Sequence, residues 1–278
     1  MRASRLAFAS AFLFVAPLLL SGCSGRRIVA VDPFPCGDAG ASGCTGLLDD
    51  LVGFWRLNEA SGSAAALDWS ARGNDGMLEG IDPGSAWVAG GPDGRALAPQ
   101  GKGYVVVPPS TSIDSITMRV TMAAWIYIDG SITDFATAIS RQIGTSYGQL
   151  YHLSIRSDLT PAMFITTPAS TQVFISGPTP VPQQTWVHIA GTYDGARGRL
   201  YLNGVEVASA AVTGPFATET NPVILSGNGN ASGPDYTERI PGRLADVMLF
   251  RRALSAQEIV QLKNVDWGGV RRDASTGQ

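Results

Sequence analysis

The sequence lacks the residues on which zinc proteins and nucleic-acid-binding proteins depend. Its 278 residues include two histidines and three cysteines, with no Cys-x-x-Cys pair and no His-Glu-x-x-His motif. This excludes the common zinc sites. The 20 basic and 23 acidic residues give a formal net charge of −3, and no run is rich in lysine or arginine. The electrostatic footprint of a nucleic-acid-binding protein is therefore missing.

Helical patterns are also scarce. The one segment that predicts a helix is Ala256–Asn264, where Ser255 is placed to cap the first turn and Glu258 completes a capping box. The 33 glycines and 17 prolines separate short apolar runs, and strands do not alternate with helices. This pattern predicts an all-β fold, an antiparallel two-sheet jelly-roll sandwich with one short C-terminal helix. The clearest predicted strands are Gly103–Val107, Val120–Ile128, Leu150–Ile155, Trp186–Tyr193, Arg199–Leu202, Val205–Ser209 and Val223–Leu225.

Residues 1–22 predict a secretory signal peptide. Two arginines precede the apolar run Leu6–Leu20, which is shorter than the ~20 residues that span a bilayer. Residues 20–23 (Leu-Ser-Gly-Cys) resemble the lipobox of bacterial lipoproteins, which implies cleavage before Cys23 and lipid on its thiol. We therefore expect an exported protein that is lipid-anchored to the cell envelope, and Ser24 is compatible with the outer membrane. The alternative is an ordinary signal peptide followed by a chance cysteine.

Residues 23–46 have no hydrophobic period and predict a lipidated tether. It contains Cys36 and Cys44, for which an exported compartment permits a disulfide, with two free thiols as the alternative. We expect one folded domain over residues 47–267 and a disordered tail over residues 268–278.

Six segments along this domain carry a family resemblance. They are LVGFWRLNEASG, DWSARGNDGMLEG, WVAGGPDGRALAPQGKGYVVVP, VTMAAWIYI, TWVHIAGTYDGARGRLYLNGVEVAS and IPGRLADVMLFRRALSAQEIVQL. In this order they resemble the laminin-G-like, concanavalin A-like jelly-roll domains of secreted bacterial proteins. The resemblance implies the fold but no single function, because the fold serves lectins, adhesion modules, glycan-binding modules and glycosidases.

The resemblance also implies a structural calcium site. In the family, the loop that corresponds to residues 68–75 often binds Ca²⁺, together with the acid of a late strand, which here is Asp246. Asp68 and Asn74 supply oxygen ligands of the kind that calcium prefers, and Glu59 is a further candidate. The alternative is that Asp68 and Asn74 cap turns without a metal.

Strand alternation predicts a ligand-binding face. Because successive side chains point to opposite faces of a strand, the apolar sets that face the core leave aromatic and polar side chains on the other side. Such a face suits a sugar, whose C–H face stacks on rings while its hydroxyls form hydrogen bonds. The alternative is a second packed layer under a long loop such as Thr167–Pro182. If these strands share one sheet, the outer face carries Trp125, Tyr127, His152, Arg156, His188 and Tyr201.

Catalytic patterns are weak. A retaining glycosidase needs two carboxylates about 5–5.5 Å apart, and no predicted strand carries acids at positions i and i+2 or i+4. Both histidines lie in mid-strand, which argues against a Ser-His-Asp triad. We therefore expect a non-enzymatic, calcium-stabilised recognition module that binds a glycan or a surface protein and contacts the membrane only through its lipid. The alternatives are a polysaccharide-active hydrolase and a purely structural or adhesion domain with a protein partner.

Overall fold

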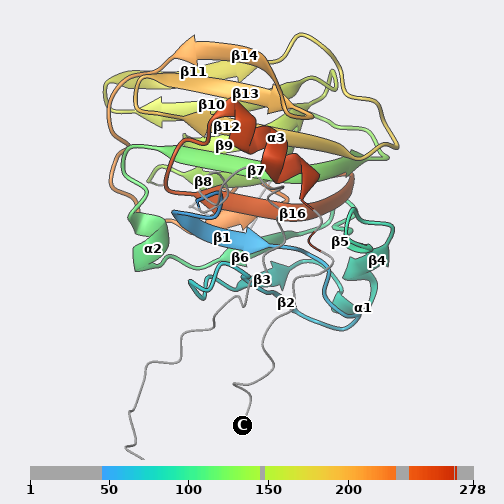
Figure 1. Ribbon diagram of the computed structural model, residues 1–278. Coiled ribbons are helices and arrows are strands. Elements are labelled where there is room, and N and C mark those ends of the chain that lie inside the picture. The colour runs from blue at the N-terminus through green and yellow to red at the C-terminus, as the bar shows by residue number, and fades with distance from the viewer. Residues whose placement is uncertain (1–45, 145–147, 230–237, 266, 268–278) are drawn as a thin grey trace, which may run out of the picture.

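The computed structural model describes residues 46–144, 148–229, 238–265 and 267. They form two antiparallel β-sheets packed face to face with three short helices (Figure 1). This confirms the predicted two-sheet sandwich with a C-terminal helix. The predicted signal peptide, the lipidation site Cys23 and the predicted disulfide between Cys36 and Cys44 lie outside the described residues. Within the described ranges, none of the helices has the length and hydropathy of a membrane-spanning segment.

The first sheet contains eight strands, and its centre is formed by β7 (Val120–Ile128), β12 (Val187–Tyr193) and β16 (Gly242–Phe250). Their register is antiparallel throughout, and β1 (Leu51–Trp55) pairs with β16 beside the main path. In spatial order the other strands are β14 (Val205–Ala211), β13 (Arg197–Leu202), β12 (Val187–Tyr193), β7 (Val120–Ile128), β16 (Gly242–Phe250), β5 (Arg95–Leu97) and β4 (Trp87–Ala89).

The second sheet also contains eight strands, and its long members are β8 to β11. In spatial order they are β11 (Ser170–Ser176), β10 (Pro161–Thr167), β9 (Gln149–Arg156), β8 (Phe135–Gln142), β15 (Val223–Leu225), β6 (Tyr104–Val107), β3 (Gly76–Glu79) and β2 (Ala65–Ala66). The helices are α1 (Pro83–Ala86), α2 (Thr111–Asp114) and α3 (Ala256–Asn264).

The main core lies between the two sheets, and strand alternation places the residues in it. Met122 and Ile126 of β7 and Ile189 of β12 are fully buried there, opposite Leu153 and Ile155 of β9. These residues are the ones that the alternating pattern assigned to the interior. The predicted orientation of each of these strands is therefore confirmed.

Helix α3 packs on the outer face of the first sheet and forms a second, smaller core. The predicted capping box is present, because the Ser255 hydroxyl accepts from the Glu258 amide and the Glu258 carboxylate accepts from the Ser255 amide. Ile259 and Leu262 are buried against residues of the sheet that include Tyr201. Figure 1 shows the helix lying across the front of this sheet.

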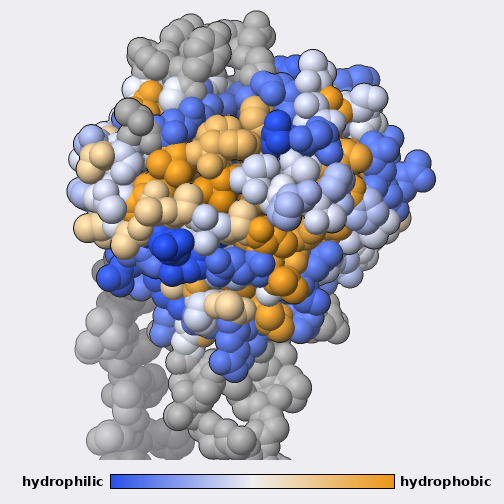
Figure 2. All heavy atoms as spheres, turned by 90° about the horizontal axis from the view of Figure 1, so that it is seen from above, coloured by the Kyte–Doolittle hydropathy of each residue, from blue (hydrophilic) through white to orange (hydrophobic). Residues whose placement is uncertain are grey.

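Among the strands of seven or more residues, β8, β10 and β11 had no counterpart among the predictions, and the short strands β2 to β5 had none either. The expected long loop Thr167–Pro182 is wrong, because it contains β11, which pairs with β10. Edge strands β11 and β14 lie at the top of the molecule in Figure 1, and apolar atoms gather there when it is seen from above (Figure 2). Their exposed large apolar residues are Phe174, at 44% exposure, and Val205, at 65%.

Candidate functional site

The six predicted ligand-binding residues lie on two different sheets. Each side chain points away from the main core, as its strand pattern predicted. However, β9 pairs with β8 and β10 in the second sheet and not with the strands of the first. The prediction of one shared face is therefore wrong: Trp125, Tyr127, His188 and Tyr201 belong to the first sheet, and His152 and Arg156 belong to the second.

Helix α3 covers part of the outer face of the first sheet. Beneath it, Tyr201 is 2% exposed and His188 is 3% exposed. Burial, reinforced by the positive charge of Lys263 on the helix, lowers the pKa of His188 to about 3. A second packed layer therefore exists over these two residues, as the alternative interpretation predicted, but a helix forms it rather than the expected loop.

The rest of this face is open and aromatic. Trp125 and Tyr127 of β7 and the adjacent Trp186 are each half-buried. The Tyr127 and Trp186 rings lie 5.6 Å apart, and the Trp125 ring meets the buried His188 ring edge-on at 5.4 Å. The Trp186 indole N–H donates to the carbonyl oxygen of Gly90 at 2.7 Å, which fixes this ring at the border of the face.

A cavity of about 400 Å³ is connected to the aromatic pair through Arg243, which lines it, whereas neither Tyr127 nor Trp186 does. Its volume is within the range of small-molecule sites. The guanidinium of Arg243 lies 4.8 Å from the centre of the Tyr127 ring. Arg243 is the register partner of Tyr127 on neighbouring strands, so both side chains are on one face. We call Tyr127, Trp186, Arg243 and this cavity the Tyr127 site. The cavity is lined by Val88, Ala98, Gln100, Asp129, Gly130, Pro241, Gly242 and Arg243.

Trp186 and Arg243 were absent from the predicted site. Strand alternation does place Trp186 opposite Val187 and Ile189, so its orientation was available from the sequence. Arg243 gave no such signal, because the cavity joins segments near residues 88–100, 129–130 and 241–243 that only the folded sheet brings together.

The second sheet carries a different cluster around His152 on its outer face. The His152 Nε2 atom lies 2.7 Å from Thr137 Oγ1 and 3.1 Å from Glu238 Oε2. Cross-strand register places Phe164 directly opposite His152, and Phe174 directly opposite Phe164. The Phe164 ring lies 5.1 Å from the imidazole and 4.8 Å from the Phe174 ring. We call these residues, together with Phe135, whose ring packs on both His152 and Phe164, the His152 cluster.

Charges in the His152 cluster are compensated within the protein. Burial would raise the pKa of Glu238, but hydrogen bonds and the charge of His152, with a further hydrogen bond from Thr137, hold that pKa below its ordinary value. Arg156 is paired with Asp158 at 2.8 Å and lies 5.5 Å from the Phe174 ring. The rings of the His152 cluster pack on one another, and of these Phe174 is exposed.

The predicted calcium ligands Asp68 and Asn74 are occupied by hydrogen bonds. Asp68 Oδ1 accepts from the amides of Phe54 and Ser70, and its Oδ2 accepts from the amide of Asn74 at 2.9 Å. Asn74 Oδ1 accepts from the Ser110 hydroxyl at 2.6 Å. These contacts are the turn-capping arrangement that was the alternative to a metal.

Asp246 differs from the other predicted ligands. It lies in a β-bulge of β16 with φ of 48°, and neither of its buried carboxylate oxygens forms a hydrogen bond within the described structure. Burial and the nearby Asp93 raise the pKa of Asp246 well above its ordinary value, and Arg56 offsets part of this effect. Glu59 Oε1 accepts from the Leu67 amide.

Calcium binding by these four residues therefore stays a prediction. Among the described residues, no group of three or more histidine, cysteine, aspartate or glutamate side chains could hold a metal. Only Asp246 has both oxygens available.

The comparisons with known proteins agree with this fold. The chain belongs to the concanavalin A-like lectin/glucanases superfamily, whose laminin-G model matches residues 99–260. A comparison with curated protein sequences gave no match.

Several solved structures share the sandwich. One is domain 4 of AbnA, a GH43 extracellular arabinanase from Geobacillus stearothermophilus in complex with arabinotriose, with 16% identity, a TM-score of 0.55, and coverage of 77% of this chain and 98% of that chain. Another is the binding domain of Paraclostridial Mosquitocidal Protein 1, with 18% identity, a TM-score of 0.58, and coverage of 78% and 52%. A Trypanosoma rangeli sialidase has 19% identity and a TM-score of 0.56, and the match covers 83% of this chain but 35% of the sialidase. At these identities the likeness shows the fold alone.

Proposed function

We propose that this protein is a carbohydrate-recognition module that binds a sugar at the Tyr127 site. The observation that carries the proposal is a half-buried aromatic pair, Tyr127 and Trp186, whose rings lie 5.6 Å apart and which Arg243 connects to a cavity of about 400 Å³. Apolar surface that a protein leaves in contact with water tends to mark an interaction site.

The groups around the cavity suit a sugar. The ring faces of Tyr127 and Trp186 offer a stacking surface for the C–H groups of a pyranose or furanose. Gln100, Asp129 and Arg243 line the cavity and provide amide, carboxylate and guanidinium groups that hydrogen-bond to hydroxyls. Membership of a lectin and glucanase superfamily, and the arabinotriose in the complex of the AbnA domain, support a glycan as the ligand class.

We further propose binding without hydrolysis. A glycosidase of the common kind needs two carboxyl groups on either side of the scissile bond, and Asp129 is the one carboxylate among the residues that line this cavity. The predicted signal peptide and the lipid on Cys23 complete the proposal, because they would hold the module at the cell envelope. Two or more acyl chains are needed for stable anchoring.

The proposal is tested with a glycan array and matched aromatic variants. Tyr127→Ala should weaken binding of any glycan that the wild type captures by at least about tenfold, because removing an aromatic anchor at the centre of an interface commonly costs ~2 kcal/mol. The matched control is Phe174→Ala, which removes an exposed ring from the opposite sheet and should leave binding unchanged.

Other outcomes contradict the proposal. If Phe174→Ala abolishes binding and Tyr127→Ala does not, the ligand binds at the His152 cluster. If the wild type captures no glycan on an array of neutral and acidic sugars, recognition of carbohydrate is wrong. Release of reducing ends from a bound polysaccharide would show that the protein is a hydrolase.

A further inference from the structure

The Tyr127 site contains a cation that forms no ion pair within the described part of the chain. Several other arginines of the described structure are paired with carboxylates, such as Arg56 with Asp93 at 2.8 Å and Arg199 with Asp194 at 2.6 Å. Arg243 forms neither an ion pair nor a hydrogen bond with any described residue, and its guanidinium lies over the Tyr127 ring.

That contact orients the guanidinium. Arg243 is half-buried, and its guanidinium carbon lies 4.8 Å from the centre of the Tyr127 ring. Stacking on an aromatic ring uses the flat face of the guanidinium and leaves its N–H edge available. Because Arg243 also lines the cavity, this edge borders the space in which a ligand would lie. The fixed, planar donor set matches the geometry of a carboxylate or a sulfate.

We propose that the sugar bound at the Tyr127 site is anionic, and that its carboxylate or sulfate group pairs with Arg243. This inference rests on the proposed function, because it names the class of sugar that the same site selects. The aromatic pair would bind the ring of an acidic sugar while Arg243 binds its charged substituent.

Asp129 is the feature that opposes an anion in this cavity. Asp129 is exposed, so water screens its charge, and within the described structure it forms no ion pair with Arg243. Its carboxylate can accept hydrogen bonds from sugar hydroxyls. Asp129→Asn should therefore strengthen binding of an acidic glycan.

The experiment compares sugars that differ only in charge. The wild-type protein is titrated with oligogalacturonate and with its fully methyl-esterified form, and with a sulfated oligosaccharide and its desulfated form. We expect at least about tenfold tighter binding of one charged member than of its neutral partner, and an affinity that falls as salt is raised from 50 to ~300 mM. The two pairs distinguish a carboxylate from a sulfate.

Two variants connect this preference to the site. Arg243→Gln should remove the preference for the charged sugar, whereas Arg119→Gln should retain it. Arg119 is an exposed cation just before β7, eight residues from Tyr127, or roughly 26 Å along an extended strand, so the control removes the same charge far from the site. Arg243→Lys, which keeps the charge without the planar donor set, should restore only part of the preference.

The outcomes separate the two proposals. Binding of neutral sugars that depends on Tyr127, with no preference for charged ones, would overturn the anionic ligand and leave carbohydrate recognition intact. A charge preference that persists in Arg243→Gln would also overturn it. If no sugar of either pair and none on the array binds to the wild type, both proposals are wrong.

Discussion

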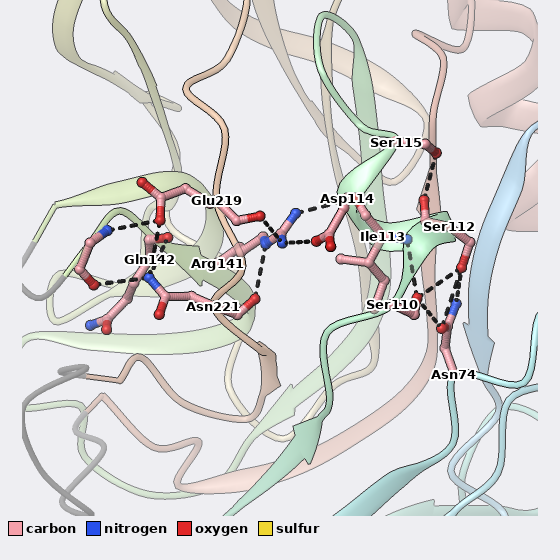
Figure 3. Close-up of polar contacts among 11 residues, drawn as sticks. Asn74, Ser110, Ser112, Ile113, Asp114, Ser115, Arg141, Gln142, Glu219 and Asn221 are labelled. Carbon is pink, nitrogen blue, oxygen red and sulfur yellow. Dashed lines mark hydrogen bonds and ion pairs between the residues drawn. The ribbon is translucent and has the colours of Figure 1, made fainter.

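Arg141 should be the most important single polar side chain for stability. It projects from β8 into the interior and is 1% exposed. Its guanidinium donates to the Asp114 carboxylate and to the carbonyl oxygens of Ile113, Asn221 and Glu219, the last at 2.7 Å (Figure 3). These bonds attach α2 and the segment 219–221 to the second sheet.

Replacing Arg141 by methionine keeps much of the side-chain length and removes every donor. Each carbonyl left in the interior without a partner costs roughly 1–3 kcal/mol. The Asp114 carboxylate also loses its partner, but it is partly exposed, so this loss adds at most ~1 kcal/mol. Because the methionine would recover some apolar burial, we expect Arg141→Met to lower the free energy of unfolding by about 3–5 kcal/mol in urea titrations.

The control for this variant is Asp114→Asn. Asparagine keeps a side-chain oxygen that can accept from Arg141, and the three carbonyl contacts of the guanidinium remain, so the loss should be clearly smaller than for Arg141→Met. A loss below ~1 kcal/mol for Arg141→Met, or equal losses for both variants, would refute the reasoning that the buried carbonyls depend on this arginine.

Three further predictions follow from the remaining buried and terminal groups. The pKa of Asp246 is raised in the folded protein, so the folded state favours the protonated carboxyl and stability should fall as pH rises above ~4. Asp246→Asn should flatten this pH dependence in thermal melts. A Ca²⁺-dependent stabilisation of the wild type that the variant lacks would instead identify Asp246 as a metal ligand. Because the pKa of His188 is lowered to about 3, the NMR signals of its ring should not titrate between pH 5 and 8. The stability of the protein should decrease as pH falls from ~6.5 towards 3. A ring titration near pH 6.5 would show that α3 does not bury His188. Cys23→Ser should move the protein from the membrane fraction to the soluble fraction, and membrane retention of this variant would contradict lipidation.

The sequence predicts the local structure of this protein better than its long-range pairing. In β7, strict alternation between apolar residues and Trp125 or Tyr127 determines which side faces the core, and the structure confirms it. The capping box at Ser255 is likewise a local signal. Neither pattern depends on which strand lies alongside, so both can be read from a single segment.

Sheet membership is different, because it depends on contacts between distant segments. His152 and His188 have the same local pattern, a histidine on the outward side of an apolar strand, yet they lie on opposite sheets. Strand β10 begins at Pro161, and β11 contains serine, threonine and glutamine, so their periodicity is weak. The partners of β9 are β8 and β10, and neither was predicted, so the sheet to which β9 belongs could not be assigned and the six predicted residues were expected on one face.

The size of α3 explains why part of the aromatic face stays open. A helix of nine residues is about 14 Å long, whereas a strand of nine residues such as β7 extends about 30 Å. The helix therefore covers His188 and Tyr201 but cannot reach the end of β7, where Tyr127 lies beside Trp186 and Arg243. His188 and Tyr201 belong to a packed layer. Tyr127 and Trp186 carry a hydroxyl and an indole N–H on their rings, and the guanidinium of Arg243 has no ion-pair partner among the described residues. If these positions served only to pack under another layer, Leu or Val would suffice there. Tyr and Trp instead combine an apolar ring with a polar group that contacts water or a ligand. The residues at the uncovered end are instead those that suit contact with a polar ligand.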